Sequence, residues 1–426
     1  MQSSCTFREE ATYGFQPSRV GWRIFLVAFL PESPSLTNQP LRVKPTKNLP
    51  DTLPPKGRAA SIGRAWRGHS RAGSMGSQSA RRKGIPMFFY EPLSGTAIVS
   101  VLLYLVFLIG MNELSRLNKW VGGAIFIASP TVLTIFVWPH TAVEGTGAGT
   151  WFQWVKTYSC LAGAILGWLI VYFPAFQKKY VVCIPPIIFA INILEACIRD
   201  FQLTGVNGIV DGYMVVGGPW NVINGIAGIL NALCICGFFG IIVGRGKKKD
   251  FVWPDQLWFW IIGYDLWNFA YTYNSVSDRS MYCGLVLLAA CTIPAFFIKR
   301  GAYAQHRVRT LAVNMIVTMT VPWFFLHPAF IVHSTNDPAA HMTISVIALL
   351  FNAGVFVYQA YTIAVKKRNP FKQELYIDNP GFRKVYLDSI DVPEDQRDAA
   401  LANLEEFGYK AAWDEMGRVK TMVTRP

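Results

Sequence analysis

Long runs of apolar residues, separated by short polar loops, fill the chain between residues 93 and 365. As an α-helix, each run is long enough to cross a hydrocarbon core of about 30 Å. We predict nine spans, at 93–111, 120–138, 157–176, 180–198, 221–244, 257–274, 281–299, 310–332 and 343–365. Nine such runs are not expected in a large soluble protein with buried helices. The pattern therefore predicts an all-α, polytopic transmembrane helix bundle over residues 87–368.

The segment before the bundle, residues 1–86, lacks sustained periodicity and is rich in Pro, Ser, Gly and Arg. This composition predicts a disordered, basic extension. No acidic residue occurs between Thr52 and Tyr90, which is typical of an organelle transit peptide. The alternative is an upstream extension before a core that starts at Met87.

The segment after the bundle, residues 369–426, is polar. Its DVPED sequence at 391–395 predicts a helix start, with Asp391 or Val392 near the cap and Pro393 in the first turn. We expect a soluble tail with one or two amphipathic helices.

The positive charge is distributed unevenly. The net charge is +14, but residues 1–86 alone contain fourteen Lys and Arg against four acids, so a nucleic-acid partner is not expected. Loops after the odd-numbered spans contain fifteen Lys and Arg, among them Arg307 and Arg309, whereas the other loops contain three. Basic residues collect in cytoplasmic loops. The C-terminus is therefore predicted in the cytosol or its topological equivalent, in a membrane that the sequence does not identify.

Several reaction classes find no support. Seven of the eight Cys lie within predicted spans, where a thiol behaves as a small apolar group. The chain contains no HExxH, Walker, GxSxG or CxxC motif. We expect no bound metal and no cofactor.

The sixth predicted span, WFWIIGYDLWNFAYTYN, contains a carboxylate at mid-span. At about 100° per residue, Asp265, Asn268 and Thr272 fall on one face, flanked by Tyr264 and Tyr271. A charged residue at this depth normally faces the bundle interior or a cavity. We predict a polar site on this face, although a structural role for Asp265 is an alternative.

The fourth span presents a second polar face. Asn192, Glu195 and Arg199 follow one another at i, i+3 and i+7. They indicate either a Glu195–Arg199 ion pair near the outer boundary or a carboxylate that binds a proton or a cation. The following loop, 199–220, is glycine-rich and half apolar, so we expect a short re-entrant or interfacial segment.

The fifth span presents a third polar face. Asn221, Asn224 and Asn231 lie within an arc of about 80°. Such a stripe serves equally well as hydrogen-bonding contact between helices or as a cavity wall that binds a polar solute.

Some segments resemble known families. GTWFQWVKTYS, LEACIRDFQ and GGPWNVINGIAGILN, with the sixth span, resemble an uncharacterised family of multi-pass membrane proteins over about residues 87–375. That resemblance implies a helical membrane bundle and no activity. GWLIVYFPAFQKKYVVCIPPIIFAINILE more faintly resembles the integral-membrane terpene cyclases, seven-helix enzymes in which an early Glu and a late Asp act as acids. Glu195 and Asp265 would match, but Leu194 replaces an expected Trp and nine spans replace seven.

Three functions remain open from the sequence. A transporter would use the polar faces to bind a small solute, a proton or a cation. A membrane-embedded enzyme would use Glu195 or Asp265 as a general acid on a lipid or isoprenoid. A structural scaffold would need neither. Transport explains the three polar faces best, and the oligomeric state is not predicted. The predicted ligand-binding residues are Asn192, Glu195, Arg199, Asn221, Asn224, Asn231, Tyr264, Asp265, Asn268 and Tyr271.

Overall fold

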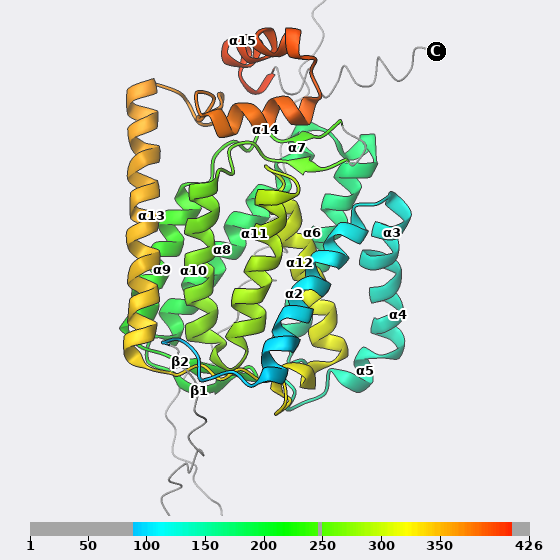
Figure 1. Cartoon of the computed structure of the whole chain (residues 1–426), viewed down its shortest axis with the longest axis vertical. Helices are drawn as coiled ribbons and strands as arrows, with labels where there is room; N and C mark the ends of the chain where they lie inside the picture. Colours follow the sequence, from blue (N-terminus) through cyan, green and yellow to red (C-terminus); the bar gives the residue numbers. More distant parts are fainter. Residues whose placement is uncertain (1–87, 246–248, 411–426) are drawn as a thin grey trace, which may run out of the picture. The chain divides into compact units, whose positions relative to one another are not determined.

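The computed structural model of the chain describes residues 88–245 and 249–410. Within these ranges, nine helical segments follow the nine predicted spans in order (Figure 1). The segments are α2 Gly95–Ser115, α3–α4 Lys119–Phe136, α6 Trp151–Tyr172, α7–α8 Lys179–Leu203, α9 Pro219–Leu233, α10 Trp258–Ser275, η4–α11 Met281–Phe297, α12 Tyr303–Thr320 and α13 Pro338–Lys366. The prediction of an all-α bundle is confirmed. The predicted extension at 1–86 lies outside the described residues.

Shorter elements connect the nine segments. They are α5 Trp138–Thr141, η2 Pro174–Phe176, η3 Ser277–Arg279 and η5 Pro322–Leu326. Two of the nine segments include a π-helical section, η1 Ala124–Ala128 between α3 and α4, and η4 Met281–Val286 before α11.

Five of the nine segments are long and apolar enough to cross a membrane: α2, α3–α4, α6, α7–α8 and α13. Their outer faces consist of apolar side chains. On α8 these recur at helical spacing as Ile184, Ile187, Ile191, Leu194, Ile198 and Phe201, all exposed. Such a face suits hydrocarbon and not water. These helices therefore indicate a membrane protein.

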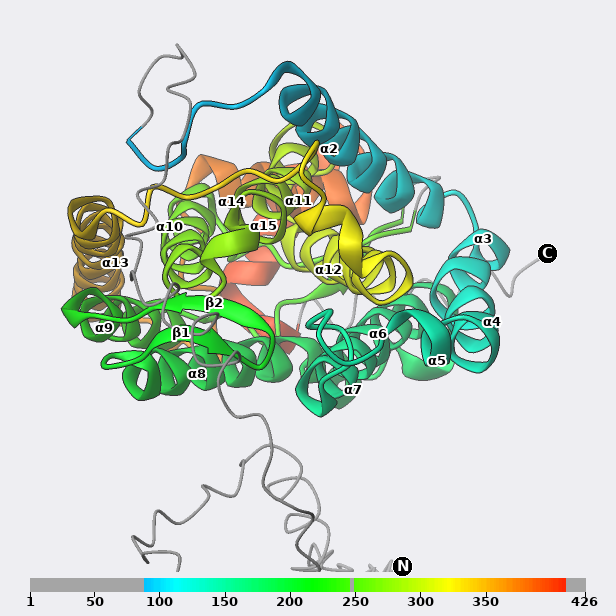
Figure 2. The same cartoon turned by 90° about the horizontal axis from the view of Figure 1, so that it is seen from below.

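Helix α10 is more polar and lies inside the bundle. It packs against α9 and α13 and also contacts α11 and α8, and Figure 2 shows it between α13 and α11. Its Trp260, Trp267 and Tyr273 side chains are buried. Because α10 contacts protein on most sides, its polar residues can form hydrogen bonds that lipid would not provide.

Two predicted spans have wrong boundaries. Helix α9 ends at Leu233, well before residue 244, because the chain turns at Gly237 (φ +71°) and the Trp253 indole donates to the Cys236 carbonyl oxygen (2.9 Å). Helix α12 runs from Tyr303 to Thr320 instead of 310–332. Its polar first turns are buried in the bundle, which hydropathy alone did not indicate.

A β-hairpin replaces the interfacial segment expected at 199–220. Strands β1 (Asn207–Val210) and β2 (Tyr213–Val216) pair antiparallel. Asp211 and Gly212 form the turn, with φ of 51° and 80°. Asp-Gly favours this turn because both residues tolerate positive φ. We call the end of the bundle with this hairpin the hairpin end.

The opposite end, the tail end, contains a second small strand pair, β3 (Ile242–Val243) with β4 (Phe251–Val252). The tail helices α14 (Pro380–Ile390) and α15 (Arg397–Phe407) follow α13, and the short η6 turn (Glu394–Gln396) precedes α15. Helix α14 packs against β3 and α15. The helix start expected at 391–395 is misplaced: Asp391 is the C-cap of α14, Pro393 precedes the η6 turn, and α15 begins at Arg397.

The tail is anchored to the bundle by aromatic contacts. The Tyr376 ring lies edge-on to Phe259 of α10 (5.4 Å between centroids) and stacks on Tyr358 of α13. Its hydroxyl donates to Gln359 Oε1 (3.1 Å). This rigid contact brings the preceding Glu374 into the protein interior.

Two carboxyl groups meet beneath the tail. Asp255, just before α10, and Glu374 are 3% and 2% exposed. Among the described residues no basic group pairs with them, and the groups near Asp255 are the Cys236 thiol, Glu374 and the backbone amides of Leu375 and Tyr376. Burial raises the pKa of Asp255 to about 7. Burial and the adjacent Asp255 carboxyl together raise the pKa of Glu374. Two adjacent negative charges repel each other, so the tail docks best when this pair of carboxyl groups is protonated.

We predict that attachment of the tail weakens as the pH rises from about 4 to about 7. Both folded pKa values are raised, so the stability contribution is complete below the unfolded pKa of about 4 and is lost through the folded pKa. Asp255→Asn should flatten this dependence and stabilise the protein at pH 8 by on the order of 2 kcal/mol. Thermal unfolding in detergent at pH 5 and pH 8 measures it. Asp395→Asn, an exposed tail carboxylate, is the control, and an equal pH effect in both variants would contradict the prediction.

Candidate functional site

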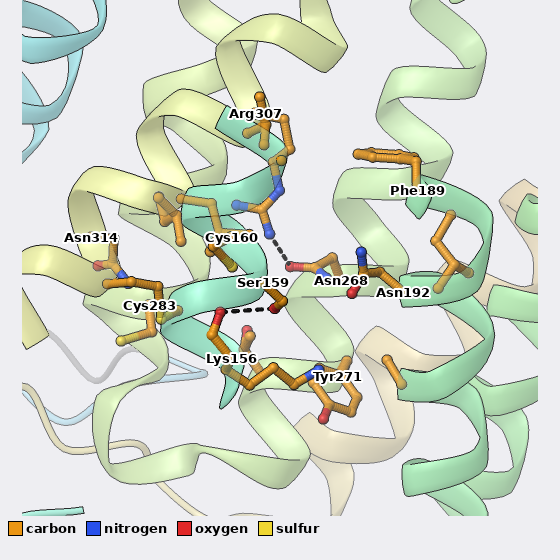
Figure 3. A pocket seen from close by; sticks show the side chains of 18 of the residues that line it. Lys156, Ser159, Cys160, Phe189, Asn192, Asn268, Tyr271, Cys283, Arg307 and Asn314 are labelled. Atoms are coloured by element: carbon orange, nitrogen blue, oxygen red, sulfur yellow. Dashed lines mark hydrogen bonds between the residues drawn. The ribbon is translucent and has the colours of Figure 1, made fainter. Parts of the chain in front are cut away.

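A cavity of about 280 Å³ lies between α6, α8, α10 and α12 (Figure 3). At the hairpin end its wall includes Val210 and Tyr213, and toward the tail end it includes Phe251 and Gln305. The cavity therefore extends over most of the depth of the bundle. Its wall is mainly apolar, with a few polar side chains, as is usual for sites that bind organic molecules.

Five of the ten predicted ligand-binding residues line this cavity. They are Asn192, Arg199, Tyr264, Asn268 and Tyr271. The other five do not line it: Glu195, Asn221, Asn224, Asn231 and Asp265. The three polar faces predicted from the sequence are thus present as helix faces, but they do not all border one void.

Asp265 lies in the seam between α10, α11 and α12. Its two carboxylate oxygens accept from Thr292 Oγ1 (2.6 Å) and Tyr303 Oη (2.8 Å). Asn268, three residues later, is directed to the cavity and accepts from Arg307. One polar face of α10 therefore contributes to two different places, because Tyr303 of α12 binds Asp265 and Arg307 of α12 binds Asn268.

Glu195 and Arg199 do not pair with each other. Glu195 accepts from Lys156 of α6 (2.6 Å), and Arg199 donates to Asp211 in the hairpin turn (2.6 Å). The predicted pair on one helix is replaced by partners on other elements, because α6 and the hairpin approach α8 there. These two ion pairs tie α6 and the hairpin to α8 at the hairpin end of the cavity.

The asparagines at the start of α9 bind an acid that the sequence analysis did not select. Asn221 and Asn224 donate from their Nδ2 atoms to Asp200 Oδ1 (3.0 Å) and Oδ2 (2.7 Å). All three side chains are fully buried. Asp200 lies next to Arg199 in the last turn of α8, two residues beyond the predicted end of the fourth span. The sequence signal for this acid is the stripe of asparagine amides, because buried amide donors need a nearby acceptor.

Asn231 forms a contact between helices. Its Nδ2 donates to Asn352 Oδ1 (2.9 Å), and Asn352 in turn donates to the Gly263 carbonyl oxygen (2.9 Å). This chain of bonds joins α9, α13 and α10. Of the two interpretations of the asparagine stripe, hydrogen bonding within the bundle agrees with the geometry.

Arg307 is the cavity residue that the sequence analysis missed, because it was counted among loop charges. It lies in the second turn of α12 and is 5% exposed. Its Nε donates to Tyr264 Oη (3.2 Å) and its Nη2 to Asn268 Oδ1 (3.3 Å). Its Nη1 has no hydrogen-bond partner among the described residues. A buried guanidinium was detectable only once α12 was known to begin at Tyr303.

Among the described residues, no three His, Cys, Asp or Glu side chains gather as a metal site. The chemically distinctive feature of the cavity is therefore its guanidinium.

The comparisons with known proteins give a family and no activity. The model of a family of unknown function, DUF5692, matches residues 91–388, so the chain belongs to this family. This confirms the main resemblance, whereas the fainter one to terpene cyclases remains a prediction. No curated protein and no solved structure matches the chain.

We predict that Asp200→Ala lowers the free energy of unfolding by about 3 kcal/mol, because it leaves the buried Asn221 and Asn224 amides without an acceptor. Denaturation in detergent measures the change. The matched control is Asp388→Ala, which removes a carboxylate that is 46% exposed and should change the stability by less than about 0.5 kcal/mol. Equal effects of the two substitutions would show that the buried network contributes little.

Proposed function

We propose that this member of the DUF5692 family binds a small amphipathic solute in its intramembrane cavity and carries it across the membrane. One observation supports this most directly: an apolar cavity extends over most of the depth of the bundle and contains a buried cation with a free donor. A structural scaffold would have no use for this costly arrangement.

The cavity has features of a path that opens and closes. The Lys156–Glu195 and Arg199–Asp211 ion pairs lie at its hairpin end, and all four side chains are partly exposed. Exposed ion pairs are worth little, so they can break and re-form at low cost. The π-helical η4 segment contributes Cys283 to the wall. Such segments often mark functional, deformable places in helices.

Acid catalysis on a lipid is a weaker alternative. It needs a carboxyl group that faces the substrate. Asp265 does not line the cavity, and both of its oxygens accept hydrogen bonds. Glu195 and Asp211 form ion pairs, and Asp200 accepts from two asparagines. The carboxylates near the cavity are thus already engaged.

We predict that Gly167→Leu blocks transport, because Gly167 lines the cavity and a side chain there meets no atom within 4 Å. The added side chain would occupy the void without a clash. Uptake of hexyl phosphate, hexyltrimethylammonium and hexyl glucoside into reconstituted vesicles should fall at least tenfold for whichever probe the wild type carries.

Gly354→Leu is the matched control. Gly354 is also a helix glycine with no atom within 4 Å of its added Cβ, but it lies on α13 and does not line the cavity. Equal uptake by wild type and both variants, for all three probes, would contradict the proposed function.

We predict that Asp265→Asn leaves uptake within about twofold of the wild type, because the amide still bonds within the seam between α10, α11 and α12. An enzyme that used Asp265 as its acid would instead lose activity by orders of magnitude. Product analysis by mass spectrometry of lipids incubated with the two proteins tests this. Turnover present in the wild type and absent in the variant would favour the enzyme.

A further inference from the structure

The charge of Arg307 is only partly compensated. Asp265 attracts it through space, but both Asp265 oxygens are bonded to Thr292 and Tyr303. No described acid forms an ion pair with it, and its two hydrogen bonds go to neutral oxygens, Tyr264 Oη and Asn268 Oδ1. Burying an incompletely compensated guanidinium costs several kcal/mol. A bundle that retains such a group in a cavity wall gains stability when an anion binds there.

A second buried guanidinium lies two residues further along α12, on a different side of the helix and near Asp250 of the tail end. Arg309 also lines the cavity, is 1% exposed, and has no hydrogen-bond partner for Nη1 or Nη2 among the described residues. The acid at this end, Asp250, accepts hydrogen bonds from Arg116 and Gln305 and attracts Arg309 only through space. Three guanidinium nitrogens of the cavity wall therefore lack a partner.

The remaining charges around the cavity balance. Lys156 is matched by Glu195, and Arg199 by Asp211. The surplus is positive and lies on α12. A cation or proton, which the sequence left open as a ligand, would be repelled from this part of the cavity.

The rest of the wall favours an apolar body next to the anion. Leu166, Phe189 and Val308 line the same void, and Gly167 leaves room beside α6. The Arg307 fork has a planar geometry suited to phosphate and carboxylate oxygens. Figure 3 shows the Arg307 side chain directed to Asn268 inside the pocket.

We propose that Arg307 binds the oxyanion group, phosphate or carboxylate, of an amphipathic ligand whose apolar part lies along α6 and α8. This inference names the ligand class of the proposed function and rests on the same cavity. The Arg307 Nη1 atom donates to the ligand, while Tyr264 and Asn268 hold the guanidinium plane in place.

The test is a binding measurement on the purified full chain in detergent. The probes are hexyl phosphate, hexyl glucoside, which has the same tail and no charge, and inorganic phosphate. The wild type should bind hexyl phosphate at least tenfold more tightly than either of the others. Tighter binding of inorganic phosphate than of hexyl phosphate would assign the site to a free anion and overturn the amphipathic ligand.

Substitution of Arg307 gives the second arm. Arg307→Gln should weaken hexyl phosphate binding at least tenfold and leave hexyl glucoside binding unchanged, because only the charged donor is lost. Arg307→Lys, which keeps the charge without the fork, should bind with intermediate affinity. Arg383→Gln in the tail, where the arginine is 45% exposed, is the control.

The outcomes separate this inference from the proposed function. Equal binding of hexyl phosphate by wild type and Arg307→Gln, or equal affinity of the wild type for hexyl phosphate and hexyl glucoside, would overturn the anion site. If Arg307→Gln does not fold, the comparison of the three probes on the wild type still decides. Suppose that Arg307→Gln loses hexyl phosphate binding, but the wild type shows no uptake that Gly167→Leu blocks. This result would support the anion site and contradict the proposed transport.

Discussion

Polar groups inside this bundle must find their partners within the protein, and most of the structure follows from that constraint. Lipid hydrocarbon offers no hydrogen bonds, so each buried polar side chain needs another one nearby. Asp265 is held by Thr292 and Tyr303, and Asp200 by two asparagines of α9. These bonds join helices that are close in the chain, α8 with α9 and α10 with α11 and α12. They explain why the polar helix α10 lies inside, where neighbours surround it.

Buried polar groups that lack a hydrogen-bond partner therefore indicate where a ligand could bind. Arg307 faces a void with an unused donor, whereas the acids of the bundle interior are engaged. Because the carboxylates nearest the cavity are engaged and this guanidinium keeps a free donor, the geometry supports the proposed site for negative charge. The ion pairs of α8 close the hairpin end of the same void, and they are exposed enough to exchange partners. In the proposed function, Arg307 binds the ligand, whereas the ion pairs of α8 control access to the cavity.

The tail end is governed by a second electrostatic arrangement. Asp255 and Glu374 are buried together without a basic partner, and the pKa of each is raised by burial. Their protonation therefore couples the attachment of the tail to pH, at a position where the tail also packs on α10 through Tyr376. Because α10 contributes Tyr264, Trp267 and Asn268 to the cavity wall, the tail and the cavity share one rigid element.

Hydropathy and helical periodicity alone determined the number and order of the helices, because an apolar run must cross or fill the bundle wherever it packs. They also placed Asn268, Tyr264 and Tyr271 on a face that borders a cavity. The Asp211–Gly212 pair is also a local sequence signal, because this dipeptide favours a two-residue hairpin turn.

The tertiary structure decided the rest, because it depends on which helices meet. It separated Asp265 from Asn268, gave Glu195 and Arg199 partners on other elements, and buried Arg307 where the sequence indicated only another basic loop residue. The sequence shows that Arg307 is charged and would therefore be costly to bury. Only the packing of α12 against α6 and α11, with its side-chain hydrogen bonds to α10, shows that Arg307 is buried and what it faces.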